Sequence, residues 1–431
     1  MALDTDAAKR VLAHIDRDEL ARLGCDLTDI PSPTGQEKQV ADFIVDWFRR
    51  QGLKAITQEV EAGRPNAVGI LKGSGNGLSL GFNGHTDTSF TGTDEDLRMV
   101  RSVEPQSELR GSIVDGRVVR GLGISNMKGG VASFMMAAKA LKASGVELKG
   151  DVVFAAVVGE ISRTPVGPWQ SKEYRGEGAG TRHLLTHGMH TDYAVCADCS
   201  DLNIVWTQTG VVQLKIATYG KAEAAWGSDR ATMPMSELNA IVKMTRVIAA
   251  VEQWADGFER DNVYHSPTGP LFPKVNIGAI EGGAPYRPNY FPGVCTIYVD
   301  IRMPPQVRPV EIKAQLERVL DALGIEYEMD LYKSLLGHEG KGVEPLVTAA
   351  EGIYRHLFGE AIRHEAPDRA SIWTDTNVYN ELGIPAIKIG PRGRRIGPRA
   401  EEIEIDVMVK AAQIYALMAL DICSRPRPAR G

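Results

Sequence analysis

Near-continuous apolar runs of strand length are the feature of this sequence that most constrains its fold. The segment "DVVFAAVVGE" (151–160) is such a run, and it is typical of a strand buried on both faces. "TDYAVCAD" (191–198) and "IPAIKIG" (384–390) have the same character. Between them, "GGVASFMMAAKALKASG" (129–145) predicts a helix rich in Ala and Met. Strands that alternate with helices indicate the α/β class, with a mostly parallel sheet flanked by helices.

A second pattern replaces the first near Gly210. Four segments there predict strands, mostly with the apolar–polar alternation of half-exposed antiparallel strands: "VVQLKIATYG" (211–220), "KVNIGAIEGG" (274–283), "CTIYVDIRM" (295–303) and "EYEMDLY" (326–332). Two helical segments lie among them. We therefore expect one domain made of residues 1–209 and 334–431, and a small α+β domain, 210–333, inserted into it.

Composition narrows the classes of partner. A chain of 431 residues is longer than one core usually holds, and its net charge of −6 with no strong basic block argues against a nucleic-acid partner. No apolar stretch reaches about 18 residues, so no membrane partner is expected. The first twenty residues lack a signal-peptide core, and the five cysteines are scattered. We expect a cytoplasmic protein with free thiols.

Short polar segments follow the predicted strands. They are "GHTDT" with His85 and Asp87, "GISNMKGG" with Asn126, "VVGEIS" with Glu160, "CADCSD" with Asp198, and the arginine-rich "IGPRGRRIGPRAEE" (389–402). Open α/β sheets bind ligands beyond the carboxyl ends of their strands, so these side chains are the candidate site. Elsewhere, Thr34 and Glu37 have the spacing of a capping box before a predicted helix.

In this order the segments resemble those of the M20 family of metallopeptidases and deacylases. The resemblance covers nearly the whole chain and includes "NGHTD", "MKGG", "GAIEGG", "DIR" and "WTD…GIPAIKIGP". It implies a catalytic metal-binding domain and an inserted lid or dimerisation domain. It also implies a homo-oligomer, a dimer or larger, that acts on small molecules.

The resemblance also implies roles for single residues. Family members bind two metal ions through a bridging carboxylate. His85 and Asp198 match ligands of the first metal, Asp87 matches the residue that orients this histidine, and Glu160 matches the general base.

The chain departs from the family at four positions. They are the bridging carboxylate (Asn126 here), the second glutamate of a pair (Ile161), a late histidine (Ile396) and a histidine of the inserted domain that helps hold the oxyanion (near Ala224). These losses remove the carboxylate that bridges the two metals and both side chains that bind only the second metal. Aliphatic side chains replace those two ligands. We predict one divalent cation per chain, Mn²⁺ or Zn²⁺, bound by His85, the Asn126 carbonyl oxygen, Asp198 and water.

The reaction must suit a site that has lost oxyanion stabilisation. A nitro-substituted aromatic amine would spread the negative charge itself, so water could still replace its amino group. The metal would acidify the water, and Glu160 would transfer protons. An ortho carboxylate on the substrate would need a clamp. The candidate clamp residues are Arg287, Asn289, Arg392, Arg394 and Arg395.

This pattern resembles the 5-nitroanthranilate aminohydrolase branch of the family, which converts 5-nitroanthranilate to 5-nitrosalicylate and ammonia. Two alternatives stay open. One is a one-metal amidase or deacylase of N-acyl amino acids, and the other is a non-catalytic binding protein on a decayed scaffold. The retained Glu160 favours an enzyme. The long segment 162–177 is a candidate lid or assembly contact.

Overall fold

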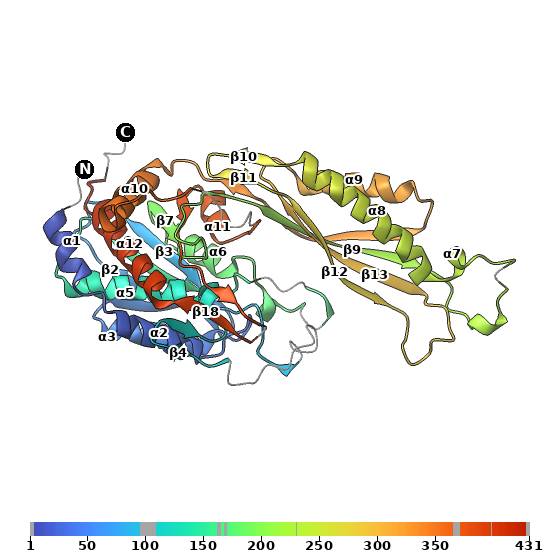
Figure 1. The fold of residues 1–431 in the computed structure, drawn as a ribbon, viewed down its shortest axis with the longest axis horizontal. Helices are drawn as coiled ribbons and strands as arrows, with labels where there is room; N and C mark the ends of the chain where they lie inside the picture. Colours follow the sequence, from blue (N-terminus) through green and yellow to red (C-terminus); the bar gives the residue numbers. More distant parts are fainter. Residues whose placement is uncertain are drawn as a thin grey trace. The chain divides into compact units, whose positions relative to one another are not determined.

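The computed structural model describes residues 4–94, 109–161, 165–167, 170–229, 231–364, 371–397 and 399–427 (Figure 1). Two compact units divide the chain between them. The first comprises Met1–Trp206, Gly340–Asp368 and Thr374–Gly431, and the second comprises Thr207–Glu339 and Arg369–Trp373.

A six-stranded sheet forms the centre of the first unit. Its strands, in spatial order, are β1 (Lys54–Glu61), β2 (Arg64–Leu71), β6 (Val152–Val157), β3 (Leu80–His85), β7 (Tyr193–Cys196) and β16 (Ala386–Lys388). Strands β6, β3, β7 and β16 run parallel, whereas β1 and β2 pair antiparallel at one edge. The apolar runs that predicted buried strands lie in the parallel part.

Helices cover both faces of this sheet. They are α1 (Thr5–Leu12), α2 (Arg17–Thr28), α3 (Lys38–Arg50), α5 (Gly129–Ala143), α6 (Ala179–Thr186), α10 (Glu344–Phe358), α11 (Thr376–Glu381) and α12 (Ile405–Cys423). On one face, the ring of Phe82 lies 5.4 Å from that of Phe154 and 5.3 Å from that of Tyr415 in α12. On the other face, Val153 packs with Leu184 of α6.

A small antiparallel sheet completes the first unit. Its strands are β17 (Arg394–Arg395), β18 (Glu401–Glu404), β5 (Val118–Arg120) and β4 (Ser112–Val114), in that order. Arg394 pairs with Glu402 and Arg395 with Glu401 across the β17–β18 ladder. The sheet contacts the distorted turn Ile124–Lys128, which precedes α5.

The second unit is an antiparallel sheet with two long helices. The sheet order is β12 (Lys274–Gly282), β13 (Val294–Met303), β9 (Gly210–Tyr219) and β14 (Tyr327–Leu335). The two long helices are α8 (Ala240–Asp261) and α9 (Pro309–Asp321), and the short helix α7 (Met235–Leu238) precedes α8. Two short strand pairs complete the unit: β10 (Tyr264–Ser266) with β11 (Gly269–Leu271), and β8 (Thr207–Gln208) with β15 (His338–Glu339). Along β13, alternate residues such as Ile297 and Ile301 are buried in a core with Val251 of α8 and Leu316 of α9. The predicted α/β fold with an added α+β domain is confirmed.

The expected capping box before α3 is wrong. The Thr34 hydroxyl donates to the Asp87 carboxylate at 2.8 Å, and the helix begins without a side-chain cap. The Glu37 carboxylate is buried and accepts two hydrogen bonds from the guanidinium of Arg64, one of them from Nε at 2.9 Å. A buried carboxylate requires such a partner, so tertiary contacts override the local spacing. Arg64 also donates to the Arg175 carbonyl at 2.8 Å.

Three further expectations concern local features. Among the described residues, no helix combines the length and apolar character needed to cross a bilayer. All five cysteines are free thiols. In the candidate lid 162–177, residues 162–164 and 168–169 lie outside the described part of the chain, so its role stays a prediction.

Candidate active site

Three neighbouring parallel strands position the centre of the site. His85 is the last residue of β3, Glu160 follows β6, and Asp198 follows β7. Strand β3 lies between the other two, so all three side chains start from the same edge of the sheet. This is the placement that the sequence pattern predicted.

His85 is buried and is oriented through both ring nitrogens. Its Nδ1 lies 3.0 Å from the backbone carbonyl oxygen of Asp87 and 3.4 Å from the Asp87 carboxylate. Its Nε2 lies 3.0 Å from Asn126 Oδ1 and 3.6 Å from Glu160 Oε2. Since Nδ1 donates to the carbonyl, Nε2 is the nitrogen that faces the other candidate ligands.

The charge around His85 is strongly negative. Burial by itself would lower the pKa of His85, but the carboxylates of Glu160, Asp87 and Asp198 raise it well above the ordinary value. Nε2 and Asn126 Oδ1 lie 3.0 Å apart, and either a proton or a divalent cation would fit between this nitrogen and this amide oxygen.

Asp87 connects His85 to the Glu160 segment. Its carboxylate accepts hydrogen bonds from the backbone N–H groups of Glu160 at 3.1 Å and Ile161 at 3.0 Å, and from Thr34. Burial raises the pKa of Asp87, but the hydrogen bonds and the charge of His85 outweigh it and hold the pKa below its ordinary value. The Asp87 carboxylate thus contacts both His85 and the backbone of the Glu160 segment, and its role of orienting His85 stays a prediction.

Glu160 has the environment of a proton-transfer group. It is 8 % exposed, and burial is the main cause that raises its pKa well above the ordinary range. The charges of Asp198, Asp375 and Asp87 raise the pKa further. A carboxyl group that holds a proton more tightly than usual is suited to both general-base and general-acid steps.

Asp198 is buried beside these groups. Its Oδ1 accepts a hydrogen bond from the Cys199 backbone N–H at 2.6 Å, and its charge acts on both His85 and Glu160. Its role as a ligand stays a prediction.

Asp375 is a residue that sequence analysis did not single out. It directly precedes α11 and is 1 % exposed; its carboxylate makes no hydrogen bond of ordinary length within the described residues, but the Thr181 side chain is close enough to lower its pKa. Burial, with the charges of Asp87 and Asp198, raises its pKa to about 7. Its only signal in the sequence was its place in "WTD", one of the segments that carry the family resemblance.

The charge of these groups suits a divalent cation. Several buried carboxyl groups surround a single histidine, which is an arrangement that a divalent cation would relieve. Within the described residues, no three side chains of His, Cys, Asp or Glu converge to hold a metal by themselves. The ligand set that includes the Asn126 amide stays a prediction, and its oxygen ligands suit Mn²⁺ as well as Zn²⁺.

The two isoleucines that replace family ligands are placed differently. The backbone N–H of Ile161 donates to Asp87, so this residue is part of the site. Ile396 is 43 % exposed. The expectation that both side chains occupy the second metal position therefore holds at most for Ile161.

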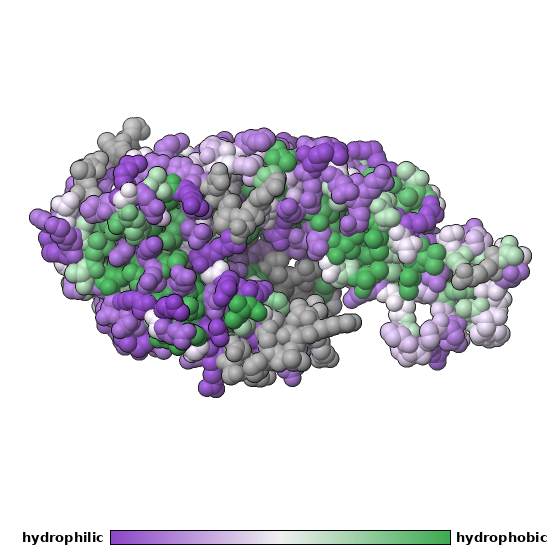
Figure 2. All heavy atoms as spheres, viewed as in Figure 1, coloured by the Kyte–Doolittle hydropathy of each residue, from purple (hydrophilic) through white to green (hydrophobic). Residues whose placement is uncertain are grey.

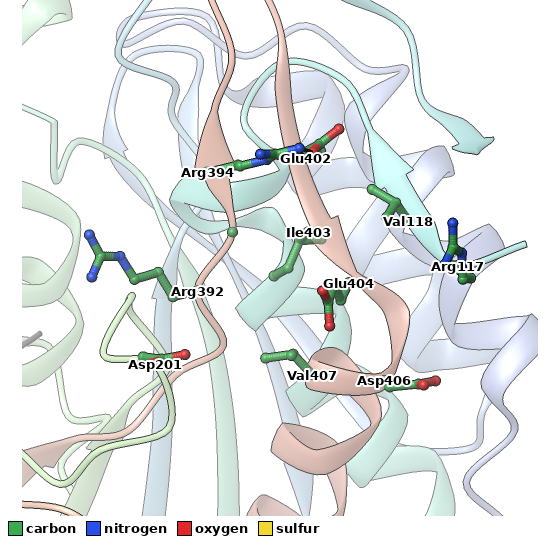
Figure 3. Close-up of a pocket in the computed structure, with 11 residues that line it drawn as sticks. Arg117, Val118, Asp201, Arg392, Arg394, Glu402, Ile403, Glu404, Asp406 and Val407 are labelled. Atoms are coloured by element: carbon green, nitrogen blue, oxygen red, sulfur yellow. Dashed lines mark hydrogen bonds and ion pairs between the residues drawn. The ribbon is translucent and has the colours of Figure 1, made fainter. Parts of the chain in front are cut away.

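Arg394, Arg395 and Arg399 of segment 389–402 contact carboxylates of the chain itself. Arg394 pairs with Glu402, and Arg395 pairs with Glu401 at 3.0 Å. Arg392 and Arg394 line a cavity of about 740 Å³ with Glu402 (Figure 3), and neither His85 nor any of its contacts lines it. The clamp role of these arginines stays a prediction.

Arg287 and Asn289 belong to the second unit, in the turn between β12 and β13. The Arg287 guanidinium lies 5.8 Å from the centre of the Tyr290 ring, and the Asn289 carbonyl accepts from the Ala225 N–H at 2.8 Å. The stretch near Ala224, where family members have a histidine, thus lies beside the stretch that carries Arg287 and Asn289, since Ala224 pairs with Tyr290.

Known proteins resemble this chain along its whole length. It is 26 % identical to an N-formyl-4-amino-5-aminomethyl-2-methylpyrimidine deformylase of Halalkalibacterium halodurans, over 96 % of this chain and 97 % of that protein. It is 24 % identical to a succinyl-diaminopimelate desuccinylase of Azoarcus, over 91 % and 95 %. These names describe hydrolases of carbon–nitrogen bonds, which agrees with the predicted class of reaction.

Solved structures share the fold. The dipeptidase Dug1p of Saccharomyces cerevisiae superposes with a TM-score of 0.70 at 13 % identity, covering 97 % of this chain and 99 % of that one. A dinuclear metal-binding peptidase of the M20 family from Bacillus subtilis gives 0.61 at 17 %, covering 94 % and 98 %. The model of peptidase family M20/M25/M40 matches residues 81–421, and the chain belongs to this family of hydrolases.

Proposed function

We propose that this chain is a hydrolase with one divalent cation that replaces the amino group of a nitro-substituted, carboxylate-bearing aromatic amine, such as 5-nitroanthranilate, by hydroxyl. One observation carries the proposal. The group that faces His85 Nε2 at 3.0 Å is the amide oxygen of Asn126, where the resemblance implies a bridging carboxylate. A neutral amide serves one cation but links two poorly, so we infer a single ion.

A single cation changes which substrates suit the site. When bound, the cation supplies Lewis acidity that favours ionisation of a water molecule. The oxyanion formed from an ordinary amide would be stabilised by one cation only, because the chain has no histidine at the family position near Ala224. A nitroaromatic ring carries the negative charge on its own nitro group, so the protein needs to stabilise that charge less.

The chain's residues then handle orientation and protons. Asp87 fixes His85 through Nδ1 and holds the backbone of Glu160. Glu160 takes a proton from a water molecule as the water oxygen bonds to the ring carbon that carries the amino group. It returns a proton to the nitrogen as the carbon–nitrogen bond breaks. The balance is one amine and one water consumed, and one phenol and one ammonia released.

A comparison of substrates tests this function. With Mn²⁺ or Zn²⁺ present, we expect ammonia release from 5-nitroanthranilate with a kcat/KM at least about 100-fold above that for acid release from N-formyl or N-succinyl amino acids, because loss of one oxyanion donor costs that much. Anthranilate without the nitro group is the matched control and should not react. Faster deacylation than deamination would reject the proposal.

That reverse result would support the second candidate, a one-metal deacylase. The observation in its favour is full-length similarity to a deformylase and a desuccinylase. Both candidates use the same cation and Glu160, so only the substrate separates them.

We also propose that the second unit forms a dimer through the edge strand β12. Every residue of β12 is partly or fully exposed, including Ile280 at 55 %, and Val294 at the start of β13 is also exposed. Figure 2 shows hydrophobic residues exposed beside strands β12 and β13. An unpaired edge of this kind is a template for pairing with a second copy around a two-fold axis.

Light scattering tests the dimer. We expect twice the mass of the chain for the wild type and a monomer for Ile280→Lys, since a charge at a paired edge opposes association. Val310→Lys, at an exposed position on α9, is the control and should remain dimeric. A wild-type monomer, or an Ile280→Lys dimer, would contradict the assignment of this edge.

A further inference from the structure

The β17–β18 hairpin presents two arginine–glutamate pairs in adjacent registers. Arg394 lies opposite Glu402, and Arg395 lies opposite Glu401. Neighbouring residues of a strand point to opposite faces. The Arg394–Glu402 pair lines the cavity drawn in Figure 3, and Arg120 joins it at 3.0 Å.

The other pair contacts the turn that carries Asn126. Glu401 is 2 % exposed, and its Oε2 accepts hydrogen bonds from the backbone N–H groups of Ser125 and Asn126, both at 3.1 Å. Its Oε1 accepts from Arg395 at 3.0 Å. The Arg395 guanidinium in turn lies 4.6 Å from the centre of the Phe90 ring, which supports it by a cation–π contact.

The backbone that Glu401 holds is not regular. Asn126 (φ −125°, ψ 94°) and Met127 (φ −135°, ψ 32°) both have non-helical backbone angles, so the backbone at Asn126 does not follow the helix that begins after it. A neutral amide is also attracted to a cation less strongly than a carboxylate would be. The approach of Oδ1 to His85 Nε2 therefore depends on how the backbone of Asn126 is held.

We propose that Glu401, supported by Arg395, is a positioning residue that holds the Asn126 amide oxygen in place as a cation ligand. The inference rests on the single-cation site of the proposed function. It assigns Arg395 to the metal site through Glu401, instead of to the substrate carboxylate.

The affinity of the metal-free protein for Mn²⁺, measured by calorimetry, tests the inference without any substrate. We expect Glu401→Gln to raise Kd at least about tenfold, which is the usual cost of losing a residue that orients a metal ligand. The glutamine cannot accept from both N–H groups and from Arg395 as an anion does. Arg395→Met should raise Kd less, in the same direction.

Glu402→Gln is the matched control. It removes the same kind of cross-strand pair one residue away but makes no contact with Ser125 or Asn126, so its Kd should stay within about twofold of the wild type. Equal losses in Glu401→Gln and Glu402→Gln would overturn the inference, because the effect would then come from the hairpin in general.

The double variant separates positioning from stability. If Glu401 acts through Asn126, Glu401→Gln should add no further loss in an Asn126→Ala background. The same fold loss in both backgrounds would overturn the inference. An Asn126→Ala variant that binds Mn²⁺ like the wild type would reject the ligand itself, and with it the proposed site. A weakened Asn126→Ala with an unaffected Glu401→Gln would reject only the positioning role.

Discussion

Glu160→Gln is expected to lower kcat by about 10²–10⁴-fold, the usual contribution of a positioned general acid–base group. The glutamine keeps the shape of the side chain but can neither accept a proton from water nor deliver one to the leaving nitrogen. Glu160→Gln should still bind the cation, because the ligand atoms proposed for the cation are on His85, Asn126 and Asp198.

Steady-state ammonia release and calorimetric Mn²⁺ binding, measured on the same preparation, check this result. Glu147→Gln is the control, since Glu147 is an exposed carboxylate just after the C-terminal end of α5, at the end of that helix opposite Asn126, and should leave both quantities unchanged. Turnover that survives in Glu160→Gln would remove the assigned role. Wild-type protein that binds Mn²⁺ and converts none of the tested substrates would favour the non-catalytic alternative.

Removal of the cation should have an effect at least as large. After dialysis against a chelator, we expect turnover to fall by more than about 100-fold, because ionisation of water and charge stabilisation both depend on the metal. One equivalent of Mn²⁺ or Zn²⁺ per chain should restore it, and a second equivalent should add nothing. Metal analysis of the replete protein should give about one ion per chain.

Two histidine variants test whether the bound cation occupies the proposed site. His85→Ala should bind no cation at the site and should be inactive. His183 is a residue of helix α6, and its ring stacks on that of His187 with 3.7 Å between ring centroids. The variant His183→Ala should therefore keep the cation at the site. Two tightly held ions in the wild type, or none under replete conditions, would contradict the single-cation site.

The secondary structure of this chain was largely readable from its sequence. Apolar runs such as 151–160 mark strands because burial on both faces leaves no polar position, and β6 lies there. Alternation in 295–303 likewise marks β13, whose residues alternate between the core and the open face. Both signals depend on neighbours along the chain, so no knowledge of distant contacts was needed.

Part of the site was also readable, for a related reason. Parallel strands end at the same edge of a sheet. Polar residues at or within three residues of the ends of β3, β6 and β7 therefore lie near one another, because the strand order places β3 between β6 and β7. The sequence placed His85 and Glu160 at strand ends but gave no distances between them.

Only the tertiary structure decided the partners of the charged side chains. Glu37 had the spacing of a helix cap, yet it pairs with Arg64. Asp375 has no local signal of its closeness to Asp87, and nothing in the sequence indicated that Arg395 pairs with Glu401 or that Glu401 contacts the backbone of Asn126. Periodicity follows from the residues next in sequence, whereas the partner of a buried charge is chosen by desolvation among groups that only folding brings together.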